Sequence, residues 1–244
     1  MATANRFAGR VVVVTGAAAG IGAAVTRRFT AEGAVVLTVD VDEPGEVEGS
    51  TVEHIRADVA NPDDWQRIAE TAERYGGADV LVSNAATVIV KPAADTADDE
   101  WHRQLEVNLS GAFFGVRALL PGLRRNRGNV VIVSSVHAHF GLPGRPAYAA
   151  SKGGLCALTR QLAADYGPQV RVNTVSPGPI ATKAWEGISA ADRRRSARQT
   201  VLDRLGGAGE VAGCVAFLAS PDASYVTGAE LVVDGGWSVT KDSM

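Results

Sequence analysis

The sequence predicts an α/β fold, with one doubly wound parallel sheet of about seven strands and helices on both faces. Three observations predict it. Short apolar runs rich in β-branched residues recur along the chain, segments with helical spacing separate them, and no linker-like stretch divides the sequence. Most runs are apolar throughout rather than alternating, which is typical of strands buried on both faces. The alternation of strands and helices favours right-handed βαβ crossovers, as in a Rossmann-like domain.

The elements follow one another in a regular order, and we expect residues 1–244 to form a single domain. The apolar runs predict strands at 11–15, 35–39, 52–56, 80–83, 130–134, 170–175 and 231–233. The helical spacing between them predicts helices at 21–32, 62–75, 97–125, 148–166 and 210–220. Residues 183–203 have no strand character, and their basic run Arg193-Arg194-Arg195 is expected to form the solvated face of a helix.

Composition excludes several classes of protein. A chain of 244 residues with 46% hydrophobic residues can bury a large core without disulfide bonds. The two cysteines, Cys156 and Cys214, form no CxxC and no Cys/His ligand spacing, so we expect apolar packed thiols, no metal site and a reducing compartment. The net charge of −3 gives no general attraction to nucleic acid. No apolar run suits a membrane span or a secretory signal, so a cytoplasmic location is expected.

The first predicted strand leads into a glycine-rich turn, Thr15-Gly16-Ala17-Ala18-Ala19-Gly20-Ile21-Gly22, that opens a helix. Glycines let the backbone approach a phosphate, and the helix N-terminus offers free N–H groups and positive potential. The spacing is GxxxGxG rather than the usual GxGxxG. Its place at the first strand-to-helix turn makes a dinucleotide site the favoured interpretation.

Asp40 ends the second predicted strand. A carboxylate at this position accepts hydrogen bonds from the adenosine ribose hydroxyls and repels a 2′-phosphate. No Arg or Lys occupies residues 17–19 or 41, where a partner for that phosphate is expected. The sequence therefore favours NAD over NADP.

Tyr148 and Lys152 lie four residues apart, so on a helix they point the same way. A cation beside a phenol favours the phenolate and makes the tyrosine a usable general acid or base. Ser135 ends a strand upstream and is placed to hydrogen-bond a substrate oxygen. A Tyr/Lys pair alone is usually a surface pair, but the combination with Ser135 and the glycine turn indicates catalysis.

In these motifs the chain resembles the short-chain dehydrogenase/reductase family from about Arg10 to Trp237. The matching motifs are residues 15–22, Asp58-Val59, Ser83-Asn84-Ala85-Ala86, Val107-Asn108-Leu109, Ser134-Ser135, residues 148–152, Pro177-Gly178 with Thr182, and Asp234-Gly235-Gly236. The resemblance implies NAD(H)-dependent interconversion of a secondary alcohol and a ketone, an enzyme acting on the CH–OH group of a small molecule. It also implies a homotetramer and a substrate lid at about residues 183–203.

The resemblance also assigns roles to residues. Tyr148 is the acid/base, Ser135 orients the substrate oxygen, Lys152 lowers the pKa of the tyrosine and grips the nicotinamide ribose, and Asn108 holds a water of a proton relay. The remaining cofactor contacts are expected at Gly16, Ala19, Gly20, Ile21, Asp40, Asp58, Val59, Asn84, Ala85, Pro177, Gly178, Ile180 and Thr182.

The substrate is less well defined by the sequence. His137 and Arg145 stand where a branch resembling 3-hydroxybutyrate dehydrogenase binds a carboxylate, but Val88 replaces a glutamine of that branch. Sugar dehydrogenases of the family carry a similar Ser-Val-His stretch. Exposed loop residues explain His137 and Arg145 equally well, and Trp185 either packs on a substrate ring or anchors the lid.

The sequence departs from the family pattern at one position, and two other functions are compatible with parts of it. Ala86 replaces a glycine usual in the family, and a positive φ there would be strained. A 3-oxoacyl thioester reductase is a different enzyme class, but such reductases usually use NADPH, which Asp40 disfavours. A non-catalytic dinucleotide-binding regulator predicts a damaged Ser/Tyr/Lys set, whereas all three residues are present.

Overall fold

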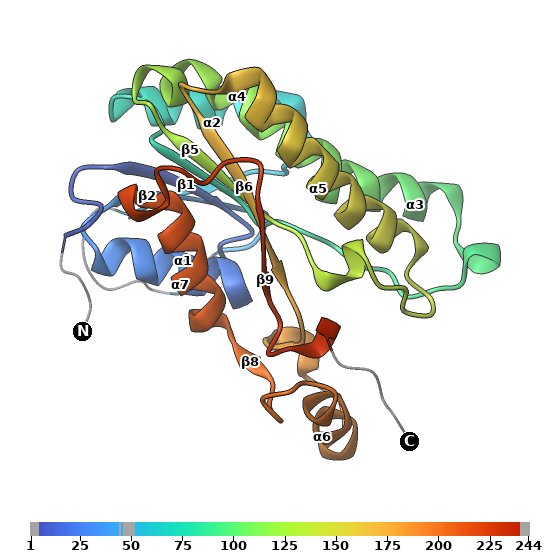
Figure 1. The fold of residues 1–244 in the computed structure, drawn as a ribbon. Coiled ribbons are helices and arrows are strands. Elements are labelled where there is room, and N and C mark those ends of the chain that lie inside the picture. Colours follow the sequence, from blue (N-terminus) through green and yellow to red (C-terminus); the bar gives the residue numbers. More distant parts are fainter. Residues whose placement is uncertain (1–4, 44, 46–51, 240–244) are drawn as a thin grey trace.

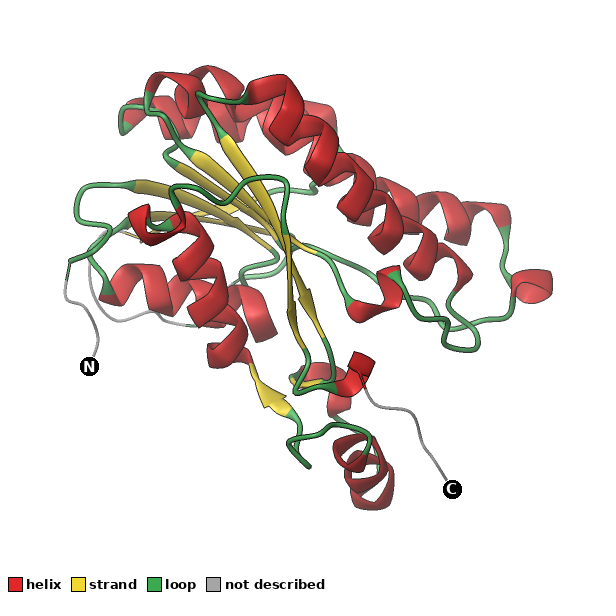
Figure 2. Cartoon of the chain, viewed as in Figure 1, coloured by secondary structure: helices red, strands yellow, loops and turns green. Residues whose placement is uncertain are grey.

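The computed structural model describes residues 5–43, 45 and 52–239. Seven parallel strands form its centre in the order β3-β2-β1-β4-β5-β6-β9 (Figures 1 and 2). The strands are β1 (Val11–Thr15), β2 (Val35–Asp40), β3 (Val52–Arg56), β4 (Val80–Ser83), β5 (Asn129–Val133), β6 (Arg171–Pro177) and β9 (Glu230–Val233). The order reverses between β1 and β4, and the carboxyl ends of these strands border the crevice where open α/β sheets bind ligands.

Helices cover both faces of the sheet, as the strand composition predicts. They are α1 (Gly20–Ala31), α2 (Pro62–Arg74), α3 (Asp98–Leu105), α4 (Gly111–Arg125), α5 (Pro146–Tyr166), α6 (Ala190–Arg198) and α7 (Ala208–Ala219). Figure 1 shows α1 and α7 side by side on one face and α2, α4 and α5 on the other. A hydrophobic core lies on each face of the sheet, and successive strand residues point into opposite cores. Val12 and Val14 pack toward α1 and α7, and Val11 and Val13 pack toward the opposite helix layer.

The predicted fold class is confirmed, and element ends differ by one or two residues. β5 starts one residue earlier than expected, and β6 runs on to Pro177. A short parallel pair, β7 (Ile180–Ala181) with β8 (Gly206–Gly207), was not predicted because each strand has only two residues and no pattern. The basic run does lie on an exposed helix, α6.

The helix predicted at 97–125 is interrupted, and this prediction was wrong. A π-helical turn, Glu106–Ser110, separates α3 from α4. Two local contacts accompany it: the Asn108 side chain bonds to the backbone of Thr87, and a Cβ on Gly111 would lie 3.0 Å from Val59 Cγ2. Such turns concentrate at functional sites.

Among the described residues, no helix is both long and apolar enough to cross a membrane.

Candidate active site

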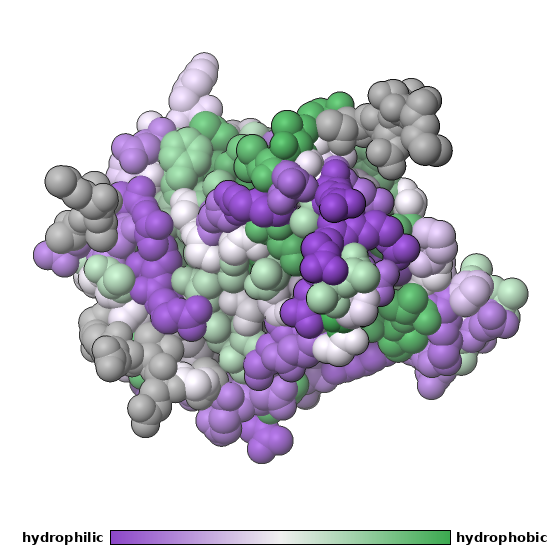
Figure 3. Space-filling view, turned by 90° about the horizontal axis from the view of Figure 1, so that it is seen from below, coloured by the Kyte–Doolittle hydropathy of each residue, from purple (hydrophilic) through white to green (hydrophobic). Residues whose placement is uncertain are grey.

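A cleft of about 1160 Å³ lies at the carboxyl edge of the sheet. It brings together every predicted site residue except Asn108, which is buried behind it. Figure 3 shows the molecule from below, the side on which α6 lies in Figure 1. Hydrophilic residues gather over α6, and residues of intermediate hydropathy lie beside them. Residues from α6 and the preceding segment, among them Trp185, Ile188 and Arg195, form one wall.

The glycine turn forms one end of the cleft. Gly16 and Gly20 have φ values of +65° and +56°, which favour glycine. A Cβ on Gly22 would lie 1.9 Å from the Gly16 carbonyl oxygen, so the turn has no room for a side chain there. No side chain caps α1 and its first turn has no acidic residue. The helix N-terminus is therefore suited to an anionic group such as a pyrophosphate.

Asp40 lies beside this turn. Its Oδ2 accepts a hydrogen bond from the Ala18 backbone N–H at 2.8 Å, and its Oδ1 accepts one from Asp42 at 3.2 Å. The carboxylate lines the cleft, where a ribose is expected.

Two further predicted residues are braced by contacts that the sequence did not indicate. Asp58 pairs with Arg103 at 2.8 Å, and both line the cleft. The Asn84 Nδ2 donates to the carbonyl oxygens of Thr15 at 2.9 Å and Gly16 at 3.0 Å, so it ties β4 to the glycine turn. Arg103 was missed because its helical position gives no signal in a single sequence.

Ala86, which replaces a usual glycine, lines the cleft. It is not among the residues with positive φ in the described part of the chain. The replacement therefore carries no backbone strain of that kind.

Tyr148, Lys152 and Ser135 meet at the other end of the cleft. Tyr148 and Lys152 come from the first turns of α5, and Ser135 follows β5. The Lys152 Nζ lies 5.5 Å from the centre of the Tyr148 ring and donates a hydrogen bond to the Val133 carbonyl oxygen at 2.9 Å. Burial lowers the pKa of Lys152 to about 8.

The electrostatics of the phenol differ from expectation. Burial raises the pKa of Tyr148, while a hydrogen bond with the Ser135 hydroxyl and the charge of Arg145 act in the opposite direction. The net shift in the described chain is therefore upward, because desolvation of the phenol outweighs the groups that favour its ionised form. The lowering of this pKa by Lys152 stays a prediction for the site with its cofactor bound.

Asn108 lies in the π-helical turn. Its Oδ1 accepts from the Thr87 N–H at 2.7 Å, and its Nδ2 donates to the Thr87 carbonyl oxygen at 2.9 Å and the Ser151 hydroxyl at 3.2 Å. The side chain thus fixes the segment after β4 against α5. The predicted water relay stays a prediction.

An aromatic corner surrounds the space next to Tyr148. The His137 ring lies edge-on to Tyr148 at 5.9 Å and to Trp237 at 6.3 Å between ring centres, and Phe140 packs on Trp237 at 5.5 Å. Burial lowers the pKa of His137, and the Arg145 charge adds to this, while the Phe140 carbonyl opposes it. Sequence reasoning missed Trp237. Its position depends on a chain reversal in which Asp234 accepts N–H bonds from Gly236 and Ser238, both at 2.8 Å.

Comparison with known proteins agrees with this fold and site. The family model described as enoyl-(acyl carrier protein) reductase matches residues 16–238. L-fucose dehydrogenase of Oryctolagus cuniculus is 41% identical, over 97% of this chain and 87% of that protein. Cyclopentanol dehydrogenase of Comamonas testosteroni is 38% identical, over 96% of this chain and 99% of that protein. The structure of an aldohexose dehydrogenase of Thermoplasma acidophilum superposes with a TM-score of 0.92 at 33% identity, covering 99% of this chain and 98% of that one.

The fold, the cleft and these relatives define a dinucleotide-dependent oxidoreductase. The chain belongs to the short-chain dehydrogenase/reductase family. Its reaction class is the interconversion of a secondary alcohol and a ketone, with the CH–OH group as donor.

Proposed function

We propose that this protein is an NAD(H)-dependent dehydrogenase of a small polar secondary alcohol, such as a sugar or a hydroxy acid. The observation that carries the cofactor choice is the Asp40 carboxylate beside the glycine turn. A negative group at this place accepts bonds from ribose hydroxyls and repels the 2′-phosphate of NADP.

The residues of the cleft divide into a cofactor end and a substrate end. The glycine turn and the N-terminus of α1 would hold the pyrophosphate, Asp40 the adenosine ribose, and Ile180 and Thr182 the nicotinamide side. The nicotinamide supplies the hydride chemistry. The protein provides orientation and the proton path.

Tyr148 gives a proton to a ketone oxygen or takes one from an alcohol. Ser135 hydrogen-bonds to the phenol, so both hydroxyls lie where one substrate oxygen can contact them. The Lys152 Nζ lies over the Tyr148 ring, 5.5 Å from its centre. We expect its charge to favour the ionised phenol and its amine to contact the nicotinamide ribose when the cofactor is bound. Positioned acid/base catalysis of this kind contributes about 10²–10⁴-fold to the rate.

The substrate end favours a polar ligand with a ring or a short carbon chain. His137 and Arg145 offer hydrogen-bond donors, and Trp185, Trp237 and Leu142 offer apolar contact. Two of the relatives above are named for sugars and one for a cyclic alcohol, which supports the same range of substrates. Residues 183–203 would act as the lid.

Two properties of the whole protein belong to the same proposal. We place it in the cytoplasm, in keeping with two cysteines that form no disulfide. We also propose a homotetramer, supported by an exposed apolar groove on α4 and α5 that is lined by Leu109, Phe113, Phe114 and Leu158.

A substrate screen tests the proposal directly. Sugars, hydroxy acids and cyclic alcohols are offered with NAD⁺ and, in parallel, with NADP⁺, and reduced cofactor is read by absorbance. We expect turnover with NAD⁺, and we expect Asp40→Ala to narrow the preference for NAD⁺ over NADP⁺. Preference for NADP⁺ together with reduction of 3-oxoacyl thioesters would support the reductase alternative. No turnover across the panel would support a non-catalytic regulator.

A further inference from the structure

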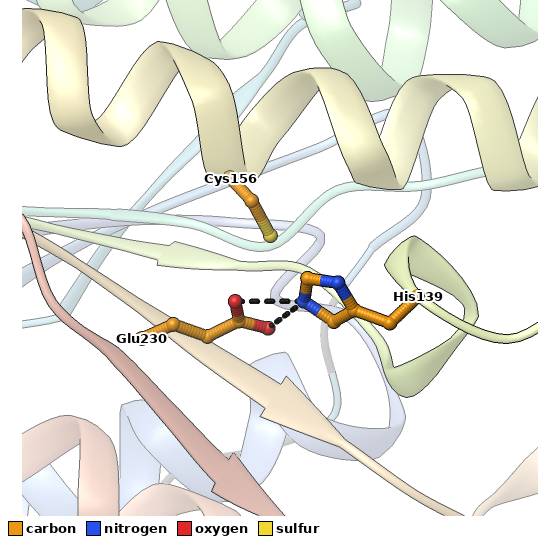
Figure 4. Close-up of side chains that lie close together, drawn as sticks. All are labelled: His139, Cys156 and Glu230. Atoms are coloured by element: carbon orange, nitrogen blue, oxygen red, sulfur yellow. Dashed lines mark hydrogen bonds and ion pairs between the residues drawn. The ribbon is translucent and has the colours of Figure 1, made fainter.

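His139, Cys156 and Glu230 come together at a point that the catalytic cleft does not include (Figure 4). His139 follows the short turn after β5, Cys156 lies on α5, and Glu230 opens β9. One ligand atom of each, an imidazole nitrogen, a sulfur and a carboxylate oxygen, lies within 4.8 Å of the other two. The spacing of these residues in the sequence predicts no metal site, because only the fold brings the three side chains together.

The three side chains point toward one another and are held in place by hydrogen bonds. The His139 Nε2 lies 2.9 Å and 2.8 Å from the two carboxylate oxygens of Glu230. The Ser176 hydroxyl donates to Glu230 Oε1 at 2.5 Å, which fixes the carboxylate. The Cys156 Sγ is 3.5 Å from the Ser134 hydroxyl. Cys156 is therefore buried as expected, but its sulfur faces polar groups rather than an apolar core.

The donor set has the chemistry of a transition-metal site. Imidazole, thiolate and carboxylate are the three ligand types of Zn²⁺, whereas Mg²⁺ and Ca²⁺ take oxygen ligands. A thiolate and a carboxylate together balance the charge of a divalent ion. Three protein ligands leave a fourth position for water.

Binding an ion requires the ligand atoms to shift. Metal–ligand bonds of about 2.0–2.3 Å place tetrahedral ligand atoms roughly 3.3–3.7 Å apart. The nitrogen–oxygen pair must therefore open by about half an ångström, and the sulfur, which lies within 4.8 Å of both atoms, must approach them by up to about one ångström. The His139 side chain is 49% exposed, so it is free to make this movement and it marks the path by which an ion enters.

We propose that His139, Cys156 and Glu230 form a binding site for a borderline-soft divalent transition metal, with Zn²⁺ as the ion that fits best, apart from the catalytic cleft. Ser176 orients the Glu230 ligand from outside. A bound ion joins α5 to β9 and to the segment after β5, three parts of the chain that meet behind the catalytic residues.

Cobalt provides a spectroscopic test on the intact protein. Co²⁺ is titrated into the metal-free chain, and thiolate ligation is read as a near-ultraviolet charge-transfer band, followed by displacement with Zn²⁺. We expect saturation at one ion per chain. Cys156→Ser abolishes the band, while His139→Gln and Glu230→Gln weaken binding by more than the roughly 10–100-fold typical of outer-shell changes.

Matched variants keep the result interpretable. Cys214→Ser removes the other thiol and His102→Gln an exposed histidine elsewhere, and both should leave the titration unchanged. If Cys156→Ser fails to fold, the exposed His139→Gln still decides the question. Absence of a charge-transfer band in the unaltered protein overturns the proposal, as does a band that persists in His139→Gln and Glu230→Gln at unchanged affinity. In those cases the cluster is a structural ion pair beside a buried thiol.

Discussion

Lys152 is a basic residue that is almost fully buried in the candidate active site. It is 2% exposed, and its pKa is lowered from 10.5 to about 8 by burial. The folded chain thus disfavours the charged form of a side chain that the unfolded chain solvates freely. The buried charge of Lys152 destabilises the folded protein, but a cation beside Tyr148 is required for the proposed chemistry.

This cost has a pH signature. Below pH 8 Lys152 is protonated in both states and the folded state bears the burial penalty. Between pH 8 and 10.5 the unfolded chain binds more protons, so the contribution of Lys152 to stability rises with pH. Compared with Lys152→Met, the unaltered protein should gain up to roughly 3 kcal/mol across this window. Urea unfolding of both proteins at several pH values measures it, and parallel stability curves would contradict the assigned burial.

The sequence predicted much of the candidate site, because its motif residues lie at strand ends or helix starts. Asp40, Ser135, Tyr148 and Lys152 each stand at a strand end or a helix start, so sequence position implied spatial position. Arg103 and Trp237 also line the cleft, but their places depend on an ion pair and a chain reversal. The sequence could not predict the direction in which the pKa of Tyr148 shifts, because that direction depends on how deeply the phenol is buried.

At the scale of elements, the turn from β1 into α1 has the strictest steric requirement. The Gly22 position faces the Gly16 carbonyl oxygen, and the amide of Asn84 closes the remaining space. The backbone there follows a path that no side chain permits.

Gly22→Ala should therefore distort the turn. We expect destabilisation of about 1–3 kcal/mol and a marked loss of NADH affinity, because overpacking shifts the N–H groups that bind phosphate. Fluorescence titration with NADH and urea unfolding measure the two effects. Gly209→Ala is the control, since nothing lies within 4 Å of its added Cβ at the start of α7. A Gly22→Ala protein that binds NADH normally would contradict the proposal that the glycine turn binds the pyrophosphate.

The hydrophobic pattern predicted where the strands and helices lie. It did not predict where a helix is interrupted. The buried strands β1 and β5 carry runs of β-branched residues, so they were found within one residue. The π-helical turn between α3 and α4 coincides with the hydrogen bonds of Asn108 to Thr87 and with the close approach of Gly111 to Val59, which no local period encodes.

At the scale of the whole molecule, the outer face of α4 and α5 carries an exposed apolar groove. Phe113 is 42% exposed there, beside a groove of about 520 Å³. Burying a sheet face does not explain an exposed phenylalanine on the outer side of the helix layer. A neighbouring subunit of the proposed tetramer would cover it.

Phe113→Asp should weaken the assembly, because a charge would be buried in an apolar contact. Light scattering after gel filtration should give a tetramer mass for the unaltered protein and a smaller mass for the variant. Tyr225→Asp, at a fully exposed position elsewhere, is expected to keep the tetramer. A monomeric unaltered protein, or a Phe113→Asp variant of unchanged mass, would contradict this assignment.

Proton transfer by Tyr148 in the cleft is the central step of the proposed reaction. Tyr148→Phe keeps the ring that packs against His137 and removes only the hydroxyl. We therefore measure kcat with the best substrate of the screen, together with NADH affinity, for this variant and the unaltered enzyme. We expect a loss in kcat of about 10²–10⁴-fold with NADH affinity retained, if Tyr148 transfers the proton. Turnover at the rate of the unaltered enzyme would contradict it.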